Sequence, residues 1–291
     1  MNVLIIANPI AGGGKGEFTA NQLARELRSR GADTHTVITR AQGDARSAAA
    51  AHGYDCVASV GGDGTANEVV NGFTGTAVPL AILPLGTANV VAREYGLSRD
   101  PAVLAERIVS GKRRVLDLGS ANGHRFLMGA GAGFDAAVVN VIHAHRGKKL
   151  GLLAWILPTL KTAFTFEPAP IRVVVDGMEI ESNAGYVIIG NCRYTAGIIP
   201  FTPAAVTDDG LLDVCIIREP RPLRLAWLAL RAFFPGFTSL RSITYIKGAV
   251  VELSSASNSP VPMQVDGDPA GYLPARFEAI SRALTLVGIG D

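Results

Sequence analysis

A glycine-rich stretch that carries one acidic residue offers the first chemistry in this sequence. GGDGT, at positions 61 to 65, follows the apolar run Cys56 to Val60 and opens a helix-like segment that ends at Gly72. Backbone N–H groups at such a turn can cradle an anion where a side chain would obstruct it. A carboxylate would repel a phosphate, so Asp63 fits this site only if it meets the phosphate through a cation or a hydroxyl. The stretch therefore indicates metal-assisted phosphoryl chemistry, and a tight turn with Asp63 as an ordinary helix cap is the alternative.

Two more glycine-rich turns follow apolar runs. NPIAGGGKG, at 8 to 16, has the spacing of neither a Walker A loop nor a GxGxxG fingerprint, and by itself it is equally consistent with a flexible loop. PLGTAN, at 84 to 89, supplies Thr87 and Asn89, which are neutral groups suited to phosphate or ribose. Ligands of open α/β sheets bind where strands end, so the coincidence of three such turns predicts a shared anion site.

The elements that must position these turns alternate regularly. Short β-branched runs cover 3–7, 34–39, 55–60 and 78–83, and helix-like segments cover 18–30, 44–52 and 65–72, the second of them expected to be capped by Asp44. This alternation predicts parallel strands joined by crossovers, hence a layered α/β domain. Beyond about residue 118 strand and turn patterns dominate, and IRVVVDGMEI at 171–180 predicts a hairpin around its Asp-Gly pair. We predict an α/β domain over 1–117 and an antiparallel β-sandwich domain over 118–291.

Composition narrows the classes of function. With 291 residues, 48% of them hydrophobic and 18% charged, the chain has material for two cores and is no disordered tail. The net charge of +2 gives no support for a nucleic-acid partner. Three cysteines without CxxC spacing predict reduced, buried thiols and no zinc site. Because MNVLIIANP lacks a basic leader and no apolar run reaches about 18 residues, a cytoplasmic protein is expected.

The three turns also carry a resemblance. Together with GAGFDA at 131–136, DDGLLDV at 208–214 and VDGD at 265–268, they resemble the diacylglycerol kinase catalytic-domain family, specifically its small bacterial lipid kinases. The likeness spans nearly the whole chain in the family's order. It implies that ATP lies between the α/β domain and a β-sandwich that holds the lipid head group. The implied activity is an ATP- and Mg²⁺-dependent transfer of the γ-phosphate to the hydroxyl of a membrane lipid such as diacylglycerol.

The resemblance also implies roles for single residues. Asp63 would act near the transferred phosphate with magnesium, and Asp266 and Asp268 would form a catalytic pair with Asp268 as general base, although the family's usual residue there is glutamate. The implied cofactor-binding residues are Asn8, Thr39, Gly61, Gly62, Asp63, Gly64, Thr65, Asn67, Glu68, Gly86, Thr87 and Asn89. A structural Mg²⁺ or Ca²⁺ is implied on the Asp209 carboxylate and the backbone carbonyls of Val206 and Leu211. From the residues alone, a surface hairpin turn at VDGD and an acidic turn at DDGL are the alternatives.

Two apolar segments bear on the lipid substrate. LGLLAWILPTL, at 150–160, is flanked by basic residues, and the segment 221–241 carries Arg221, Arg224 and Arg231 with Trp227, Phe233, Phe234 and Phe237. The first is too short to span a bilayer, and both suit its interface, which predicts peripheral association with the inner face of the membrane. Packing of both segments on the sandwich is the alternative.

Other functions stay open. NAD kinase-like and phosphofructokinase-like enzymes also use a GGDG turn, although PLGTAN and the interfacial segments favour a lipid kinase. The shortened Asp268 leaves open a non-catalytic nucleotide- or lipid-binding module. His143 and His145, two apart, fall on different faces of a helix and predict no shared metal. Neither the acceptor lipid nor the oligomeric state, a homodimer included, follows from the sequence.

Overall fold

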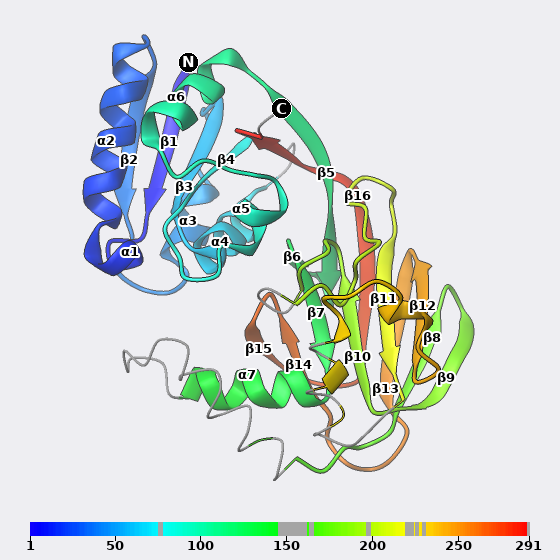
Figure 1. Ribbon diagram of the computed structural model, residues 1–291. Helices are drawn as coiled ribbons and strands as arrows, with labels where there is room; N and C mark the ends of the chain where they lie inside the picture. The colour runs from blue at the N-terminus through cyan, green and yellow to red at the C-terminus, as the bar shows by residue number, and fades with distance from the viewer. Residues whose placement is uncertain are drawn as a thin grey trace. The chain divides into compact units, whose positions relative to one another are not determined.

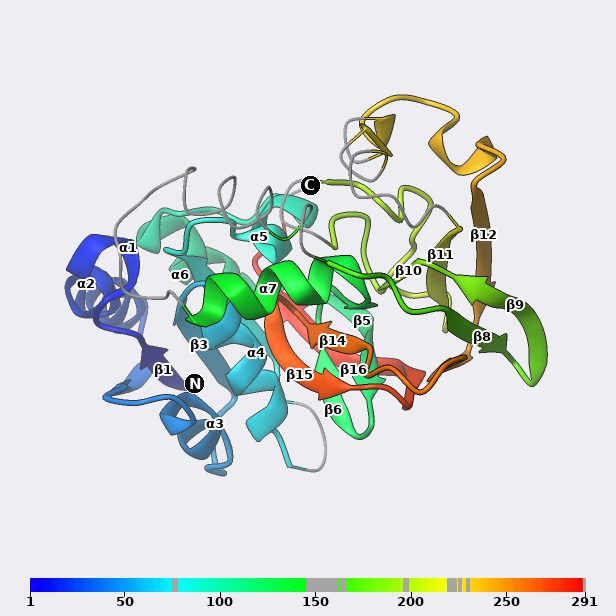
Figure 2. The same ribbon diagram turned by 90° about the horizontal axis from the view of Figure 1, so that it is seen from below.

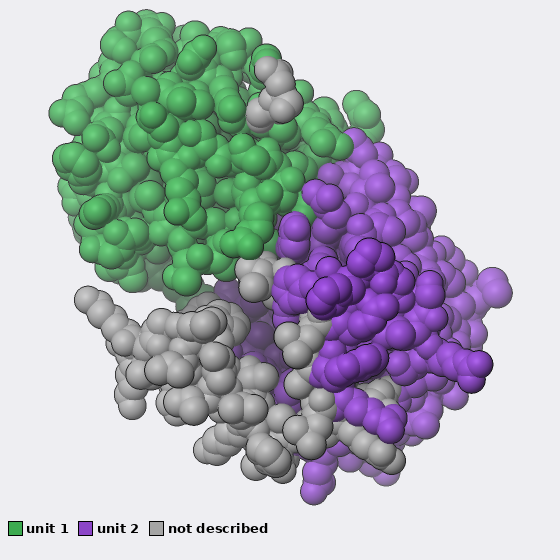
Figure 3. Space-filling view, in the orientation of Figure 1, with its two compact units in different colours: residues 1–118, 281–291 green, residues 119–280 purple. Residues whose placement is uncertain are grey.

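The protein is represented by a computed structural model that describes residues 1–74, 78–144, 162, 166–195, 199–218, 224, 227–228 and 231–289 (Figure 1). The chain divides into two compact units (Figure 3). Unit 1 comprises residues 1–118 and 281–291, and unit 2 comprises residues 119–280. The sequence prediction assigned everything beyond 117 to the second domain, whereas the last segment of the chain returns to unit 1. It returns because Leu286 and Val287 pair in parallel with Leu80 and Ala81.

Unit 1 is built around a parallel sheet. Its strands β1 (Asn2–Ala7), β2 (Asp33–Ile38), β3 (Cys56–Gly61) and β4 (Leu80–Pro84) lie in the order β2-β1-β3-β4. The helices between and after them are α1 (Ala11–Gly14), α2 (Gly16–Ser29), α3 (Asp44–Ala49), α4 (Asp63–Gly72), α5 (Val90–Glu94) and α6 (Pro101–Ser110). Strands β3 and β4 are buried along their whole length, as expected for parallel strands covered on both faces. The predicted layered α/β fold is confirmed.

One local expectation in this unit is wrong. Asp44 does not cap α3, because the N-cap is Gly43 in the left-handed conformation with φ 91° and Asp44 is the first helical residue. Its carboxylate instead accepts from the backbone N–H groups of Arg40 and Ala41 in the preceding loop, at 2.7 and 3.0 Å. These bonds lower the pKa of Asp44 below its ordinary value.

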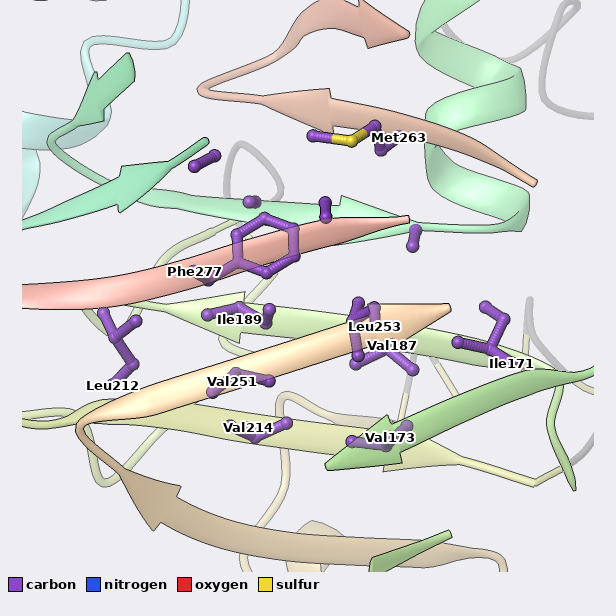
Figure 4. Close-up of a cluster of buried hydrophobic side chains, with 14 of the residues drawn as sticks. Ile171, Val173, Val187, Ile189, Leu212, Val214, Val251, Leu253, Met263 and Phe277 are labelled. Atoms are coloured by element: carbon purple, nitrogen blue, oxygen red, sulfur yellow. The ribbon is translucent and has the colours of Figure 1, made fainter. Parts of the chain in front are cut away.

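Unit 2 is an antiparallel β-sandwich, as predicted. One sheet runs β12 (Ile243–Gly248), β11 (Leu212–Ile217), β10 (Tyr186–Gly190), β7 (Gly129–Ala132), β14 (Pro262–Val265) and β15 (Asp268–Tyr272). The facing layer contains β8 (Ile171–Val175), β9 (Met178–Ala184), β13 (Val250–Ser255) and β16 (Ala275–Val287), with β5 (Arg113–Ala121) and β6 (His124–Phe126) beside them. Apolar side chains from both layers, among them Val187, Leu253 and Phe277, meet in a buried core (Figure 4). The predicted hairpin at 171–180 is confirmed as β8 and β9 around Asp176 and Gly177, whose φ angles are 48° and 80°.

A single long helix accompanies this sandwich within the described residues of unit 2. Helix α7 (Phe134–Ala144) lies against β14 and β15 (Figure 2). Near the other end of the first sheet, the short helix η1 (Phe237–Ser239) buries Phe237, whose ring centroid lies 5.9 Å from that of Phe201. Phe237 is only 2% exposed, so the expectation that it enters lipid is wrong.

The remaining sequence expectations about the chain as a whole concern cysteines and membranes. Cys56, Cys192 and Cys215 are all buried and free, which confirms the prediction of reduced thiols. No helix among the described parts of the chain combines the length and the apolar character needed to cross a bilayer. The apolar segment 150–160 lies outside the described residues.

Candidate active site

The three glycine-rich turns of unit 1 lie at the carboxyl ends of β1, β3 and β4. In the order β2-β1-β3-β4, β2 lies on one side of β1 and β3 lies on the other, so the chain changes direction across the sheet after β2. Such a change of direction opens a crevice at the strand ends, where open α/β sheets bind ligands. The backbone N–H of Asn8 donates to the Val60 carbonyl at 3.0 Å, so the first turn is tied to the strand that leads into the second.

Asn8 organises the first turn. Its side-chain Oδ1 accepts from the N–H of Ile10 at 3.2 Å, and its carbonyl accepts from the N–H of Ala11. A Cβ at Gly16 would lie 1.8 Å from that carbonyl oxygen, so only glycine fits there. Between them Gly12, Gly13 and Gly14 adopt φ angles of 63°, 72° and 91°, which turn successive N–H groups in a way that L side chains resist.

The second and third turns touch backbone to backbone. The N–H of Leu85 donates to the carbonyl of Gly61 at 2.7 Å. A Cβ on Gly86 would lie 2.6 Å from the Cα of Gly62 and 2.9 Å from Oδ1 of Asn89. Glycine at 86 is therefore required by the close approach of the two turns, and a Cβ on Gly62 would lie a tight 3.2 Å from the Cα of Gly86.

Asp63 joins the same two turns through its side chain. Its two carboxylate oxygens accept from the backbone N–H groups of Val90 and Val91, at 3.1 and 3.2 Å, at the beginning of α5. Asp63 is not the cap of α4, because Gly62 is the N-cap residue and Asp63 is the first helical residue. Burial raises the pKa of Asp63, while the N–H bonds from Val90 and Val91 act in the opposite direction.

The residues around Asp63 fit a magnesium ion only if phosphate oxygens supply further ligands. No group of three His, Cys, Asp or Glu side chains in the described ranges could hold a metal ion. Mg²⁺, however, is commonly held by one or two carboxylates together with substrate phosphates and waters. Each carboxylate oxygen has two lone pairs, so Asp63 keeps acceptor capacity beyond its two N–H bonds.

The other predicted cofactor-binding residues differ in what their side chains contact. Asn89, at φ 47°, closes the third turn by accepting from Gly86 N–H and donating to the Gly86 carbonyl, while Thr87 is exposed. Thr39 is buried and donates to the Ala7 carbonyl at 3.3 Å. Glu68 is directed elsewhere: its Oε2 accepts from the N–H groups of Gly43 and Ala45 at the start of α3. In this structure Glu68 therefore supports a helix terminus.

Asp266 in unit 2 has its carboxylate committed to the backbone. The oxygens accept from the N–H groups of three successive residues, 127 to 129, at 2.8, 2.9 and 3.0 Å. Asp266 and Gly267, with φ 49° and 81°, form the turn between β14 and β15, so VDGD is indeed a hairpin turn. These bonds suit a residue that positions the hairpin.

Asp268 presents its carboxylate differently. It begins β15, and its side chain is 41% exposed. Its Oδ1 lies 3.7 Å from Nδ1 of His143 on α7. The Asp268 side chain is thus partly open to solvent.

A buried network beneath this hairpin was not predicted. Gln264 on β14 donates from Nε2 to Oδ2 of Asp135 at 2.9 Å and accepts on Oε1 from Gly267 N–H at 2.9 Å. Burial raises the pKa of Asp135 to about 6. A Cβ at Gly131 would lie 2.2 Å from the Asp135 carboxylate, so this glycine admits the acid. The GAGFDA motif contained this signal, but pattern alone did not show which strand the acid meets.

The implied structural cation site does not fit the residues as they stand. Asp209 accepts from Leu211 N–H at 3.1 Å, and its Oδ2 lies 2.8 Å from Nζ of Lys247. Lys247 also lies 3.3 Å from Oδ2 of the buried Asp213. The Lys247 ammonium thus already neutralises the carboxylates of this loop. A metal held by Asp209, Val206 and Leu211 stays a prediction.

Comparison with known proteins identifies the family. Residues 2–121 match the diacylglycerol kinase catalytic domain, and residues 129–288 match the YegS C-terminal NAD kinase beta sandwich-like domain. A diacylglycerol kinase of Mycobacterium tuberculosis (strain H37Rv) is 32% identical over 305 residues, which cover 98% of this chain and 94% of that protein. The chain belongs to the diacylglycerol kinase catalytic-domain family. The resemblance read from the turns is confirmed.

Further relatives agree with this assignment. A diacylglycerol kinase of Bacillus subtilis is 27% identical over 97% of this chain and 95% of its own length, and a Pseudomonas aeruginosa protein named "Probable lipid kinase YegS-like" is 33% identical over 88% of this chain and 85% of its own. The solved structure of a diacylglycerol kinase from Bacillus anthracis has the same fold, with a TM-score of 0.74 at 24% identity over 99% of this chain and 96% of that one. As a member of this family, the protein is a kinase of the lipid kinase group.

Proposed function

We propose that this kinase uses ATP and Mg²⁺ to phosphorylate the hydroxyl of a membrane lipid, diacylglycerol or a related lipid alcohol. The observation that carries the proposal is the joint platform of the second and third turns, where Gly62 meets Gly86 and Asp63 accepts from Val90 and Val91. A platform of bare backbone at strand ends suits a polyphosphate. The lipid acceptor is supported by relatives from two genera that are named diacylglycerol kinases.

The chain's own residues would supply positioning and charge. Phosphoryl transfer needs little covalent help, so catalysis rests mainly on orientation and electrostatic stabilisation. Backbone N–H groups of the three turns would bind phosphate oxygens, and Asp63 would hold Mg²⁺, which when bound neutralises charge on the transferred group. Unit 2 would offer the half-exposed Asp268 to the acceptor side of the reaction.

The test is an ATP-consumption assay with purified protein and a panel of lipid alcohols in mixed micelles, with mass detection of the product. Asp63→Asn keeps one acceptor oxygen but loses the charge, and we expect its turnover to fall by roughly 100-fold or more. Asp33→Asn, at the exposed start of β2, is the matched control and should transfer phosphate normally. Phosphorylation of only NAD or a sugar phosphate, or full activity of Asp63→Asn, would reject the proposal.

We further propose peripheral contact of the kinase with the inner face of the membrane through Trp227, Phe233 and Phe234. These side chains are 54%, 48% and 63% exposed, and the exposed Arg224 lies close to them in sequence. Exposed aromatics beside basic residues suit a bilayer interface with anionic lipid. In a flotation assay with phosphatidylglycerol vesicles, replacing the three aromatics by serine should abolish co-flotation, whereas Tyr272→Ser, which removes an aromatic that is 60% exposed on β15, should not. Equal flotation of the two variants would contradict this contact.

A further inference from the structure

Strand β14 carries a buried glutamine that meets helix α7 across a glycine. Gln264 is only 3% exposed, and it pairs with Gly131 of β7 in the register of the sheet. Because Gly131 has no side chain, the space beside it admits the carboxylate of Asp135, which lies in the first turn of α7. Gln264 donates from Nε2 to Oδ2 of Asp135 at 2.9 Å. The glycine of the GAGFDA motif therefore makes room for a polar contact between β14 and α7.

The carboxylate of Asp135 accepts from three donors. Besides Gln264, these are the N–H of Ala136, at 2.6 Å, and the hydroxyl of Tyr186 on β10. Burial nevertheless raises the pKa of Asp135 to about 6, so an ionised Asp135 lowers the stability of the fold at neutral pH. Stability alone therefore does not explain why an acid occupies this place.

The polar network ends at the turn that carries Asp268. Gln264 accepts on Oε1 from the N–H of Gly267 at 2.9 Å, and Gly267 is the residue between Asp266 and Asp268. Asp266 holds the same turn through a second set of bonds, those to the N–H groups of residues 127–129. Buried polar groups that are all hydrogen-bonded fix one arrangement and make it rigid. The turn is thus held at two points, and its place relative to α7 is set by the polar contact between β14 and α7.

We propose that Asp135 and Gln264 are positioning residues for phosphoryl transfer, which hold the turn between β14 and β15 in the place from which Asp268 meets the acceptor hydroxyl; this inference rests on the proposed lipid kinase function. Gln264 is buried and acts on the reaction through Gly267, and Asp135 acts through Gln264. Phosphoryl transfer depends mainly on orientation, and a displacement of about 1 Å can lower the rate by roughly 100-fold. Loss of the network should therefore lower kcat and leave ATP binding intact.

A reciprocal exchange of the two side chains tests this pairing in the full-length protein, with ATP and the best lipid acceptor of the panel. Gln264→Glu keeps an acceptor for Gly267 but sets two carboxylates against each other, and near neutral pH its kcat should fall by roughly 10- to 100-fold. Adding Asp135→Asn again sets one carboxylate against one amide, so the double variant should recover most of the lost kcat. The KM for ATP should stay unchanged in both variants, because the three glycine-rich turns are untouched. An unchanged kcat in Gln264→Glu, or a double variant no more active than Gln264→Glu, would overturn the inference.

The pH profile and a stability control exclude a merely structural role. The kcat of Gln264→Glu relative to wild type should rise as pH falls, because one shared proton can then bridge the two carboxylates. A ratio that stays constant with pH would count against the pairing. Asp176→Asn, at the Asp-Gly turn of the β8–β9 hairpin, is the control for loss of stability, and it should lower Tm but retain kcat. A loss of kcat in Asp176→Asn equal to that in Gln264→Glu would also overturn the inference.

Hydrogen exchange separates this inference from the proposed function. The Gly267 N–H should exchange slowly in the wild type, and Gln264→Met, which removes its acceptor, should speed this exchange. Equal exchange in the two proteins would overturn the inference whether or not the enzyme is active. A wild type that phosphorylates none of the lipid alcohols would instead reject the proposed function, and the exchange result would still decide whether Gln264 holds the turn.

Discussion

Three aspartates of this kinase use their carboxylates to hold backbone N–H groups of a distant segment. Asp63 binds residues 90 and 91, Asp176 binds 249 and 250, and Asp266 binds 127 to 129. A carboxylate that accepts several N–H bonds fixes its turn strongly, because each charge-assisted bond exceeds a neutral one. Two of the three, Asp63 and Asp266, are residues for which sequence analysis implied a catalytic role. Their geometry adds a positioning role that a motif cannot reveal.

Asp135 predicts a pH dependence of stability. Its pKa rises from 3.8 to about 6 on folding because of burial, so between these values the folded chain binds more protons than the unfolded chain. Stability should therefore fall as pH rises through this window. Asparagine keeps an acceptor for Gln264 but does not titrate. Between pH 4 and pH 6.5, the free energy of unfolding of the wild type should fall by about 1–2 kcal/mol relative to that of Asp135→Asn. The Tm of the variant should therefore rise relative to that of the wild type by roughly 2–8 °C.

Thermal unfolding monitored by circular dichroism at several pH values checks this expectation. Asp33→Asn removes a carboxylate at the exposed start of β2 and serves as the control for loss of charge. A Tm difference between Asp135→Asn and wild type that is the same at every pH would show that Asp135 does not cause the pH dependence of stability.

At the scale of elements, the second and third glycine-rich turns need glycine because their backbones lie close together. Gly86 has no positive φ, and its requirement for glycine comes from the Cα of Gly62 and Oδ1 of Asn89. The first turn differs, because Gly12, Gly13 and Gly14 are all left-handed. The same residue type therefore serves two separate physical needs along one edge of the sheet.

Gly86→Ala should separate the second and third turns. The new methyl group would meet backbone that cannot rotate away, at a cost of about 1–3 kcal/mol in the free energy of unfolding. The KM for ATP should rise as well, since the phosphate platform is displaced. Gly64→Ala is the stability control: its Cβ would meet open space on α4, so Tm should stay level or increase. Equal Tm values for the two variants would contradict the close-approach argument.

The two Asp-Gly hairpin turns of unit 2 allow a matched comparison. Asn tolerates positive φ, but its NH₂ group would face a backbone N–H, so Asp266→Asn and Asp176→Asn should each lose about 1–3 kcal/mol of stability. Only Asp266→Asn should also lower kcat, because its turn carries Asp268. Tm and kcat measured on both variants check this. Equal kcat values would show that the turn at Asp266 does not position the reacting groups.

At the scale of the whole molecule, two strands are shared between the units. The unit boundaries fall inside β5 and β16, so unit 1 consists of two separate pieces of chain, whereas unit 2 is one continuous piece. In unit 1, Leu284, Leu286 and Val287 of β16 are at most 1% exposed, and Arg282 N–H donates to Asp117 at 2.6 Å. The last part of β16 thus belongs to the core of unit 1.

A fragment test follows from this topology. Residues 1–118 alone would leave β4 as an open, fully apolar edge and should be insoluble or unfolded. The same fragment joined through a glycine-serine linker to residues 281–291 should give a cooperative thermal transition by circular dichroism. Cooperative unfolding of 1–118 without the last strand would show that the boundary predicted at 117 is sufficient.

Much of this molecule could be predicted from local pattern. The alternation of apolar runs and helical segments, the three turns and the hairpin at Asp176 and Gly177 all rest on periodicity and turn chemistry within a few residues, which a linear sequence displays directly. Only the tertiary structure decided where the carboxylates of Asp63, Glu68 and Asp266 point, that His143 faces Asp268, and that the last strand returns to the first unit. Those features depend on pairs of residues far apart in the chain, and no local pattern records which of many distant partners a side chain meets.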